Sequence, residues 1–378
     1  MLARQFLHWI EGTPPRQRGA AARALARAYQ LADDDDIRNG MEAAITVLVD
    51  GAMPEVRLAL ADGLASSPDT PRHIVIALAA DLPEIAEVVL ARSPVLIDAE
   101  LVDIAAAASG RLQAAVASRA TVSGPVAAAI AEVGESAACL ALLANAGAEV
   151  ARISFKRVAE RFGDDPEVRE ALLDRPDLPA EARQVLVRAV SDALGGMMVT
   201  RAWASAERAD TVTREACEKA TVALAAESQT DELPALVEHL RVTGQLTTGL
   251  LLRAVCAGNV ALFEAALARL ASVPPRRVAH LVRGGRARAL RAVYRKAGLP
   301  PFAFAAFAAA LDTWRQLAGE GTPADRYRFT RRMVDAVLAR YDGITDGEMN
   351  ELTAMLRRFA ADQARAAARD SVAIADAA

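Results

Sequence analysis

Arginine is the residue type with the clearest chemical potential in this sequence. Between Arg269 and Leu311 the chain contains no Asp or Glu, although its formal net charge is −4. Guanidinium groups bind carboxylates and phosphates through charge-assisted, often bidentate, hydrogen bonds. We therefore predict a partner-binding surface in this stretch. Its candidate residues are Arg276, Arg277, Arg283, Arg288, Arg291 and Arg295.

Helical spacing places three of these arginines on one face. From Arg286 onward, the side chains of Arg288, Arg291 and Arg295 fall within about 60° of each other around a helix axis. We call these three residues the arginine ridge. A solvated helix face would show the same pattern, because arginine is a good helix former. The opposite side carries residues that would pack inward, namely Leu290, Val293, Tyr294 and Ala297.

Signatures of catalysis or metal binding do not accompany these arginines. None of the four histidines has a second His or Cys three or four residues away, the spacing that a zinc site on one helix needs. Neither a GxSxG elbow nor a GxxxxGK[ST] phosphate loop occurs. The run Asp33 to Asp36 suits a helix N-terminus better than a metal site, since no second ligand cluster follows it. We expect no catalytic, cofactor-binding or metal-binding residues, and no enzyme.

Two further features have a chemical and a structural interpretation. The paired glycines in LVRGGRARAL resemble an anion-binding turn at a helix start, but a helix C-cap followed by a tight turn explains them better. Cys217 has Arg214 and Lys219 nearby, which would lower the pKa of a thiol, but Glu215 and Glu218 oppose them. We therefore expect Cys217 to be a buried or boundary helix residue.

Composition favours small, closely packed helices. Hydrophobic residues make up 53% of the 378 residues and aromatic residues only 4%, so the apolar content is mostly Ala, Leu and Val. The three cysteines lie far apart and form no CxxC pair, as in proteins of a reduced compartment. The longest apolar run, Phe302–Leu311, is well short of the roughly 20 residues that cross a bilayer. We expect a cytoplasmic protein without a membrane span.

A repeated pattern follows Pro54. The motifs ASSP, ARSP, ASRA, LANA and LDRP recur at intervals of 26, 26, 26 and 30 residues, and a second helix can start three residues after each. A second motif, PEVR or PEIA, begins the other helix of three units. The predicted fold is all-α: an α-solenoid of short two-helix repeats, HEAT-like, followed by a helical C-terminal domain. The five motifs ASSP, ARSP, ASRA, LANA and LDRP end at Pro68, Pro94, Ala120, Ala146 and Pro176. The PEVR and PEIA motifs begin at Pro54, Pro83 and Pro166.

Breaks in the pattern divide the chain further. Gly195 and Gly196 are a predicted break or bend, and the polar piece Glu227–Leu233 is the predicted linker. In the last helix, Met349, Leu352, Leu356 and Phe359 form a narrow stripe that we expect to dock on the C-terminal domain. The predicted parts are N-terminal capping helices (1–53), the repeat array (54–195), a long connecting helix (196–230), a C-terminal helical domain (231–345), and a C-terminal helix with a frayed tail (346–378).

Three segments resemble a known family. They are Thr70–Ala106, the segment RFGDDPEVREALLDRPDLPAEAR that begins at Arg161, and VYRKAGLP that begins at Val293. They are similar to the bacterial family called domain of unknown function 2336, from Phe6 to about Tyr341. The resemblance implies a HEAT-type or leucine-rich-variant helical array with a helical C-terminal part. It implies no activity and no catalytic residues.

The sequence thus predicts a non-enzymatic scaffold or regulatory adaptor that binds proteins through an extended surface. The predicted partner is an acidic protein. The alternative is a nucleic-acid or phosphorylated-ligand binder that uses the Arg-rich region 269–299, and an enzyme is the third possibility. Whether the chain forms a homo-oligomer stays open at this stage.

Overall fold

The structure is a computed structural model that describes residues 2–51, 53–319, 326–340, 353–362, 364, 365 and 368. Throughout these ranges the regular elements are helices, and one isolated bridge pairs Val122 with Ala148. The chain divides into two compact units, Met1–Leu178 and Pro179–Ala378. Among the described residues, no helix combines the length and the apolar character that crossing a membrane requires.

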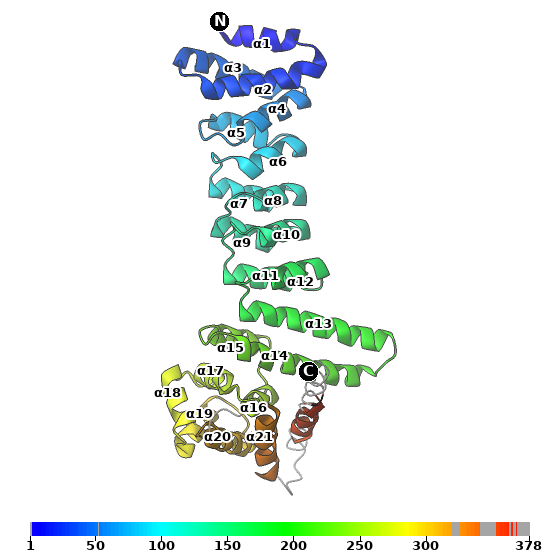
Figure 1. Ribbon diagram of the computed structural model, residues 1–378, viewed down its shortest axis with the longest axis vertical. Coiled ribbons are helices and arrows are strands. Elements are labelled where there is room, and N and C mark those ends of the chain that lie inside the picture. The colour runs from blue at the N-terminus through cyan, green and yellow to red at the C-terminus, as the bar shows by residue number, and fades with distance from the viewer. Residues whose placement is uncertain are drawn as a thin grey trace, which may run out of the picture. The chain divides into compact units, whose positions relative to one another are not determined.

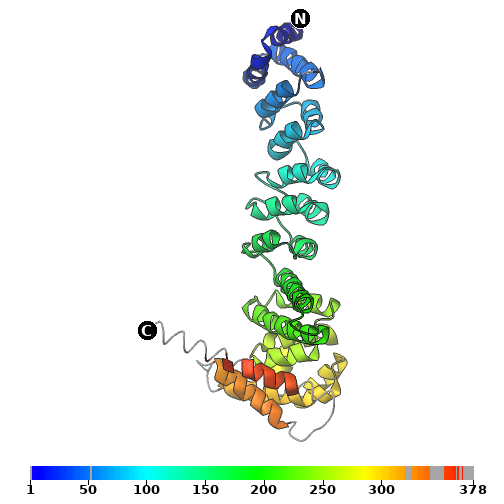
Figure 2. The ribbon, with the colours of Figure 1, turned by 90° about the vertical axis from the view of Figure 1, so that its right-hand side faces the viewer.

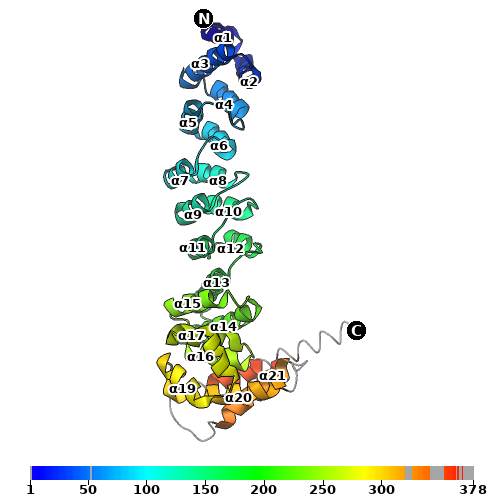
Figure 3. The same ribbon diagram turned by 90° about the vertical axis from the view of Figure 1, so that its left-hand side faces the viewer.

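The described residues of the first unit form twelve helices in two rows. The even-numbered helices pack one on the next from α2 to α12 (Figure 1), and the odd-numbered helices form the other row (Figure 3). In the even row each helix contacts the next, and in the odd row α1 contacts α3, α3 contacts α5, α7 contacts α9 and α9 contacts α11. The helices are α1 (Leu2–Gly12), α2 (Pro15–Leu31), α3 (Asp35–Gly51), α4 (Pro54–Leu64), α5 (Arg72–Ala79), α6 (Pro83–Arg92), α7 (Asp98–Ala107), α8 (Gly110–Ala117), α9 (Gly124–Val133), α10 (Ser136–Ala144), α11 (Arg152–Phe162) and α12 (Pro166–Leu173).

The proline motifs mark helix starts as predicted. Pro54, Pro83 and Pro166 are the first residues of α4, α6 and α12, where the missing N–H costs no hydrogen bond. The aspartate run also caps a helix, because the backbone N–H of Ile37 donates to Asp34 Oδ1 at 3.0 Å. The acidic side chains at the start of α3 then complement the positive end of the helix dipole.

The second helices start where expected with one exception. Pro71, Ile97, Ser123 and Pro179 are the N-cap residues of their helices. The expected start at Glu149 is wrong, since α11 begins at Arg152. The reason is a backbone link to the preceding repeat: the N–H of Glu149 donates to the carbonyl of Val122 at 2.9 Å, which keeps this segment extended.

The motifs ARSP, ASRA, LANA and LDRP are linked to one another by side-chain hydrogen bonds. In ASRA, LANA and LDRP, the side chain of the third residue donates to the backbone carbonyl of the third residue of the preceding motif. Arg119 donates to the carbonyl of Ser93 at 2.7 Å, Asn145 to that of Arg119 at 2.7 Å, and Arg175 to that of Asn145 at 3.2 Å. These bonds satisfy carbonyls that the ends of short helices leave free. We call these three residues the repeat ladder.

The second unit begins with a long helical hairpin. α13 (Ala180–Thr200) packs along α14 (Ala206–Glu227), and Ser205 caps α14 by accepting from the N–H of Arg208 at 3.3 Å. The predicted break at Gly195 and Gly196 is wrong, because α13 continues to Thr200. A Cβ on Gly195 would lie 3.3 Å from the methyl group of Thr213 on α14. The first of these glycines therefore allows close helix packing, and the turn follows at residues 201–204.

The remaining helices of the second unit surround one apolar core. Phe263 of α17 and Phe307 of α20 stack with ring centroids 4.8 Å apart, and Tyr294 of α19 packs beside Phe307. The helices are α15 (Leu233–Val242), α16 (Thr248–Cys256), α17 (Val260–Ala271), α18 (Pro275–Arg283), α19 (Ala287–Lys296), α20 (Phe304–Gly319), which a short 3₁₀ turn (Pro301–Ala303) precedes, and α21 (Arg326–Arg340). The connection from α14 to α15 falls in the predicted linker.

The last helical segment docks on this core, as its apolar stripe predicts. Leu356 and Phe359 are 0% and 3% exposed and belong to the core of the second unit. Residues 353–362 lie beside α21 (Figure 2). The other two stripe positions, Met349 and Leu352, lie outside the described residues, as does the predicted frayed tail after residue 368.

The unit boundary differs from the predicted end of the repeat array. The array was expected to run to residue 195, whereas the first unit ends at Leu178. α13 belongs to the second unit because it packs against α14 and α15. Gln184 of α13 also donates to Gln245 at 2.8 Å. The expected connecting helix, 196–230, corresponds to the end of α13 and to α14.

Candidate partner-binding site

Two consecutive amphipathic helices carry the six predicted arginines. α18 holds Arg276, Arg277 and Arg283, and α19 holds the arginine ridge, Arg288, Arg291 and Arg295. Every one of these six side chains is exposed. Both helices bury an apolar face in the core of the second unit, so that their basic positions face solvent. The buried residues are Val278, Leu281 and Val282 of α18, and Leu290 and Tyr294 of α19.

The glycine pair between these helices serves as a C-cap and a turn. The N–H of Gly284 donates to the carbonyl of His280 at 2.9 Å and closes α18. Gly285 follows with φ of +66°, which a residue with a side chain rarely adopts. This agrees with the structural interpretation of LVRGGRARAL. α19 then starts at Ala287 and presents the ridge.

The three ridge residues do not have the same surroundings. Within the described ranges, neither Arg288 nor Arg295 has an ion pair. The guanidinium carbon of Arg291 lies 4.8 Å from the centroid of the Phe304 ring, in cation–π geometry. Phe304 is itself buried at the start of α20. Arg291 therefore contributes to packing, whereas Arg288 and Arg295 are the ridge residues most available to a partner.

Two acidic residues that sequence reasoning missed face the arginines of this region. Arg283 pairs with Glu264 of α17 at 3.3 Å, and Arg269 pairs with Glu238 of α15 at 2.6 Å. Arg241 and Arg269 both donate to Glu238, which lowers the pKa of that carboxyl group from its ordinary value. The stretch 269–311 contains no acidic residue of its own. In the folded chain, however, neighbouring helices supply carboxylates to two of its arginines.

A groove with an apolar floor lies between α15, α17 and α18. Its volume is about 510 Å³, and three arginines and one glutamate belong to its lining. We call it the α17–α18 groove. It brings together Arg276 and Arg283, which the sequence singled out, with Arg269, which it did not. The lining includes Leu233, Ala261, Glu264, Ala265, Ala268, Arg269, Val273, Arg276 and Arg283.

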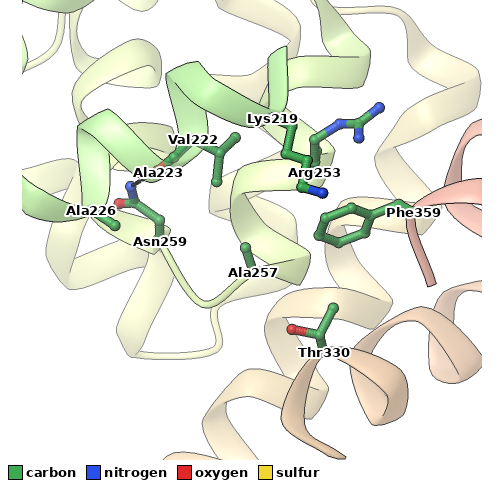
Figure 4. A pocket seen from close by; sticks show the side chains of 9 residues that line it. All are labelled: Lys219, Val222, Ala223, Ala226, Arg253, Ala257, Asn259, Thr330 and Phe359. Carbon is green, nitrogen blue, oxygen red and sulfur yellow. Dashed lines mark hydrogen bonds between the residues drawn. The ribbon is translucent and has the colours of Figure 1, made fainter. Parts of the chain in front are cut away.

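A smaller cavity lies where the last segment docks. It holds about 140 Å³ between α14, α16, α21 and residues 353–362. Lys219, Arg253 and Phe359 all belong to its lining (Figure 4). Arg253 is 3% exposed, pairs with Glu218 at 3.4 Å, and lies 5.2 Å from the centroid of the Phe359 ring. The partners of Arg253 are therefore residues of the chain itself. The cavity lies at a structural contact between the last segment and the rest of the second unit.

The cysteines have the surroundings of structural residues. All three are free and buried, and Cys217 is 7% exposed, as expected for a boundary helix residue. Burial raises the pKa of Cys139 to about 11 and that of Cys256 to about 12. Burial also raises the pKa of Cys217. Thiols in these environments stay protonated near neutral pH and are poor nucleophiles.

The described residues contain no group of three His, Cys, Asp or Glu side chains placed to hold a metal ion. The helix-capping role of the aspartate run at the start of α3 explains its position.

Comparison with known proteins places the chain in a family. The family model described as an uncharacterised protein conserved in bacteria (DUF2336) matches residues 85–347, more than two thirds of the chain. The match begins at α6, so the resemblance from Phe6 onward extends further than the family model does. No curated protein and no solved structure matches the chain. The chain belongs to this bacterial DUF2336 family.

Proposed function

We propose that this protein is a non-enzymatic interaction scaffold, in which the basic surface of α18 and α19 binds an acidic protein. The observation that carries the proposal is the pair Arg288 and Arg295. Both are exposed, and neither has an ion pair within the described ranges. A helix face kept for solubility alone would usually mix the two signs of charge, since interspersed Glu adds favourable i,i+4 pairs. α19 contains no acidic residue.

The first unit supports the scaffold part of the proposal. Its even-numbered helices form one row and its odd-numbered helices form another. The repeat ladder links equivalent positions of consecutive repeats. These features favour a HEAT-like α-solenoid, an architecture in which neighbouring repeats share one core and present an extended surface. Proteins of this kind commonly bind partners along that surface.

A protein partner explains the basic surface better than a nucleic acid does. Proteins that bind single-stranded nucleic acids usually stack bases on exposed aromatic rings. Near the arginines, Tyr294, Phe304 and Phe307 are all buried in the core. Carboxylates of an acidic protein need only the exposed guanidinium groups.

The test is affinity purification from the native cell with the double variant Arg288→Glu, Arg295→Glu. Arg291 stays unchanged because it packs on Phe304. The matched control is Arg16→Glu, Arg27→Glu on α2, which makes the same change in net charge at two exposed arginines. We expect the parent and the control to capture the same acidic protein, identified by mass spectrometry, and the ridge variant to lose it.

The melting temperature should change little in both variants, because exposed substitutions seldom shift the unfolding free energy by more than about 0.5 kcal/mol. Equal capture by all three proteins would show that the ridge is only a solvated face. Loss of the captured material on nuclease treatment would instead favour nucleic acid as the partner.

A further inference from the structure

We propose that the α17–α18 groove binds an acidic amphipathic helix of the partner. This inference rests on the proposed function, since it assigns a second contact to the same acidic protein. The floor and the rim of the groove carry different chemistry, and the two together define one kind of occupant.

The floor of the groove is a stripe of small side chains on α17. Ala261, Ala265 and Ala268 recur at intervals of four and three residues, so they share one face of the helix. Leu233 at the start of α15 and Val273 after α17 extend the apolar surface. Small residues let a second helix approach closely and pack its larger side chains between them.

The rim of the groove is basic. Arg269, Arg276 and Arg283 belong to the lining, and Glu264 is its one acidic member. Glu264 is largely covered and already pairs with Arg283, while Arg276 has no ion pair within the described ranges. Arg269 also pairs with Glu238 of α15, which is not part of the lining, so Arg276 is the rim arginine that keeps its positive charge open to an occupant. An occupant with Asp or Glu along its flanks would complement this charge.

Size and chemistry together favour a helix over a small molecule. Small-molecule sites fix their ligand with a few converging polar groups, whereas the three arginines that line this groove are exposed to solvent. α17 has 12 residues, which corresponds to a length of roughly 18 Å. An amphipathic helix that lies along α17 would place its apolar positions i, i+3, i+4 and i+7 on the alanine stripe. Its acidic positions would then reach the arginines.

The experiment uses the full chain and a display library of helix-forming peptides about 15 residues long, roughly the length that covers α17. Selection on the immobilised protein should enrich peptides with apolar residues at helical spacing and Asp or Glu beside them. Binding of the enriched peptide is then measured by fluorescence anisotropy. Enrichment of basic peptides, or of sequences without helical spacing, would overturn the proposal.

Two groove variants locate the binding site. Ala265→Trp fills the floor, and Arg276→Glu reverses one exposed rim charge without touching the core. Each should weaken binding of the enriched peptide by about tenfold or more. The matched controls are Ala24→Trp and Arg16→Glu, which make the same changes at exposed positions of α2 and should bind like the parent.

The outcome separates this inference from the proposed function. If the arginine-ridge variant loses the native partner while the enriched peptide binds both groove variants as tightly as the parent, the scaffold proposal stands and the groove assignment is wrong. If the groove variants lose the peptide but no ridge variant affects partner capture, the groove assignment stands and the ridge proposal is wrong. Because Arg276 is exposed, its variant stays informative if the tryptophan variant fails to fold.

Discussion

Asn145 connects two consecutive turns of the first unit, those after α8 and α10, through a single amide group. Its Nδ2 donates to the carbonyl oxygens of Ala117 at 2.8 Å and Arg119 at 2.7 Å, and its Oδ1 accepts from the N–H of Gly147 at 2.8 Å. The orientation of the amide therefore follows from the two carbonyls that it faces. Both donors and the acceptor are in use, so this position needs a side chain with both functions.

We predict that Asn145→Asp destabilises the first unit by about 1–3 kcal/mol, because the new carboxylate oxygen would face two carbonyls and leave them unsatisfied. The bond to Gly147 can persist, so the change isolates the ladder bonds. The measurement is urea unfolding followed by circular dichroism. Asn39→Asp, the same substitution at an exposed position of α3, is the control and should leave the midpoint unchanged. Equal midpoints for both variants would show that the ladder does not hold the repeats together.

Single residues differ in how far their roles could be predicted. The exposure of Arg288 and Arg295 follows from helical spacing within one segment, and the structure agrees. The pairing of Arg283 with Glu264 and of Arg269 with Glu238 could not be predicted this way, because each pair joins two helices. Spacing along one helix says nothing about the charges on its neighbours. The stacking of Arg291 on Phe304 was missed for the same reason.

At the scale of elements, helix starts were more predictable than helix ends. Proline and Ser or Asp caps act locally, so the starts of α3, α4, α6, α12 and α14 follow from the sequence. Gly195 was misinterpreted because a glycine in a helix has two explanations, a break or a close contact. Only the position of Thr213 on α14 decides between them.

The docked segment 353–362 allows a direct test of an element. We predict that Leu356→Ala destabilises the second unit by about 2–5 kcal/mol, because Leu356 is fully buried in its core and truncation leaves a cavity. Chemical unfolding measures the change, and light scattering on the same samples gives the mass. Arg357→Ala, its exposed neighbour, is the control.

A different result would change the role of this segment. If Leu356→Ala unfolds like the parent but changes the molecular mass from an oligomer to a monomer, the stripe serves oligomerisation. In that case the contacts with the core of the second unit would contribute little to stability, and the control variant should keep the parent mass.

At the scale of the whole molecule, the all-helical character agrees with the sequence pattern, while the first compact unit ends before the predicted end of the repeat array. The motif spacing changes from 26 to 30 residues between Ala146 and Pro176, and the first unit ends two residues later at Leu178. The change of spacing was visible in the sequence. However, the apolar pattern of α13 looks the same whether its neighbours are repeat helices or α14 and α15. The assignment of α13 to a unit depends on packing between helices distant in sequence.

The solenoid proposal predicts the dimensions of the first unit by itself. A compact domain as long as residues 1–178 would have a radius of gyration of about 16 Å. A solenoid adds each repeat at the end of a row, so its length grows with the number of repeats and its radius of gyration must exceed this value. We predict a clearly larger value from small-angle scattering of a fragment of residues 1–178, with helical circular dichroism confirming that it is folded.

Removing α11 and α12 should then shorten the particle while the remaining repeats stay helical, because each repeat contacts only its neighbours. A value near 16 Å, or cooperative loss of all helix on removing the last two helices, would mean that the repeats close into a globular core, and the scaffold proposal would lose its extended surface.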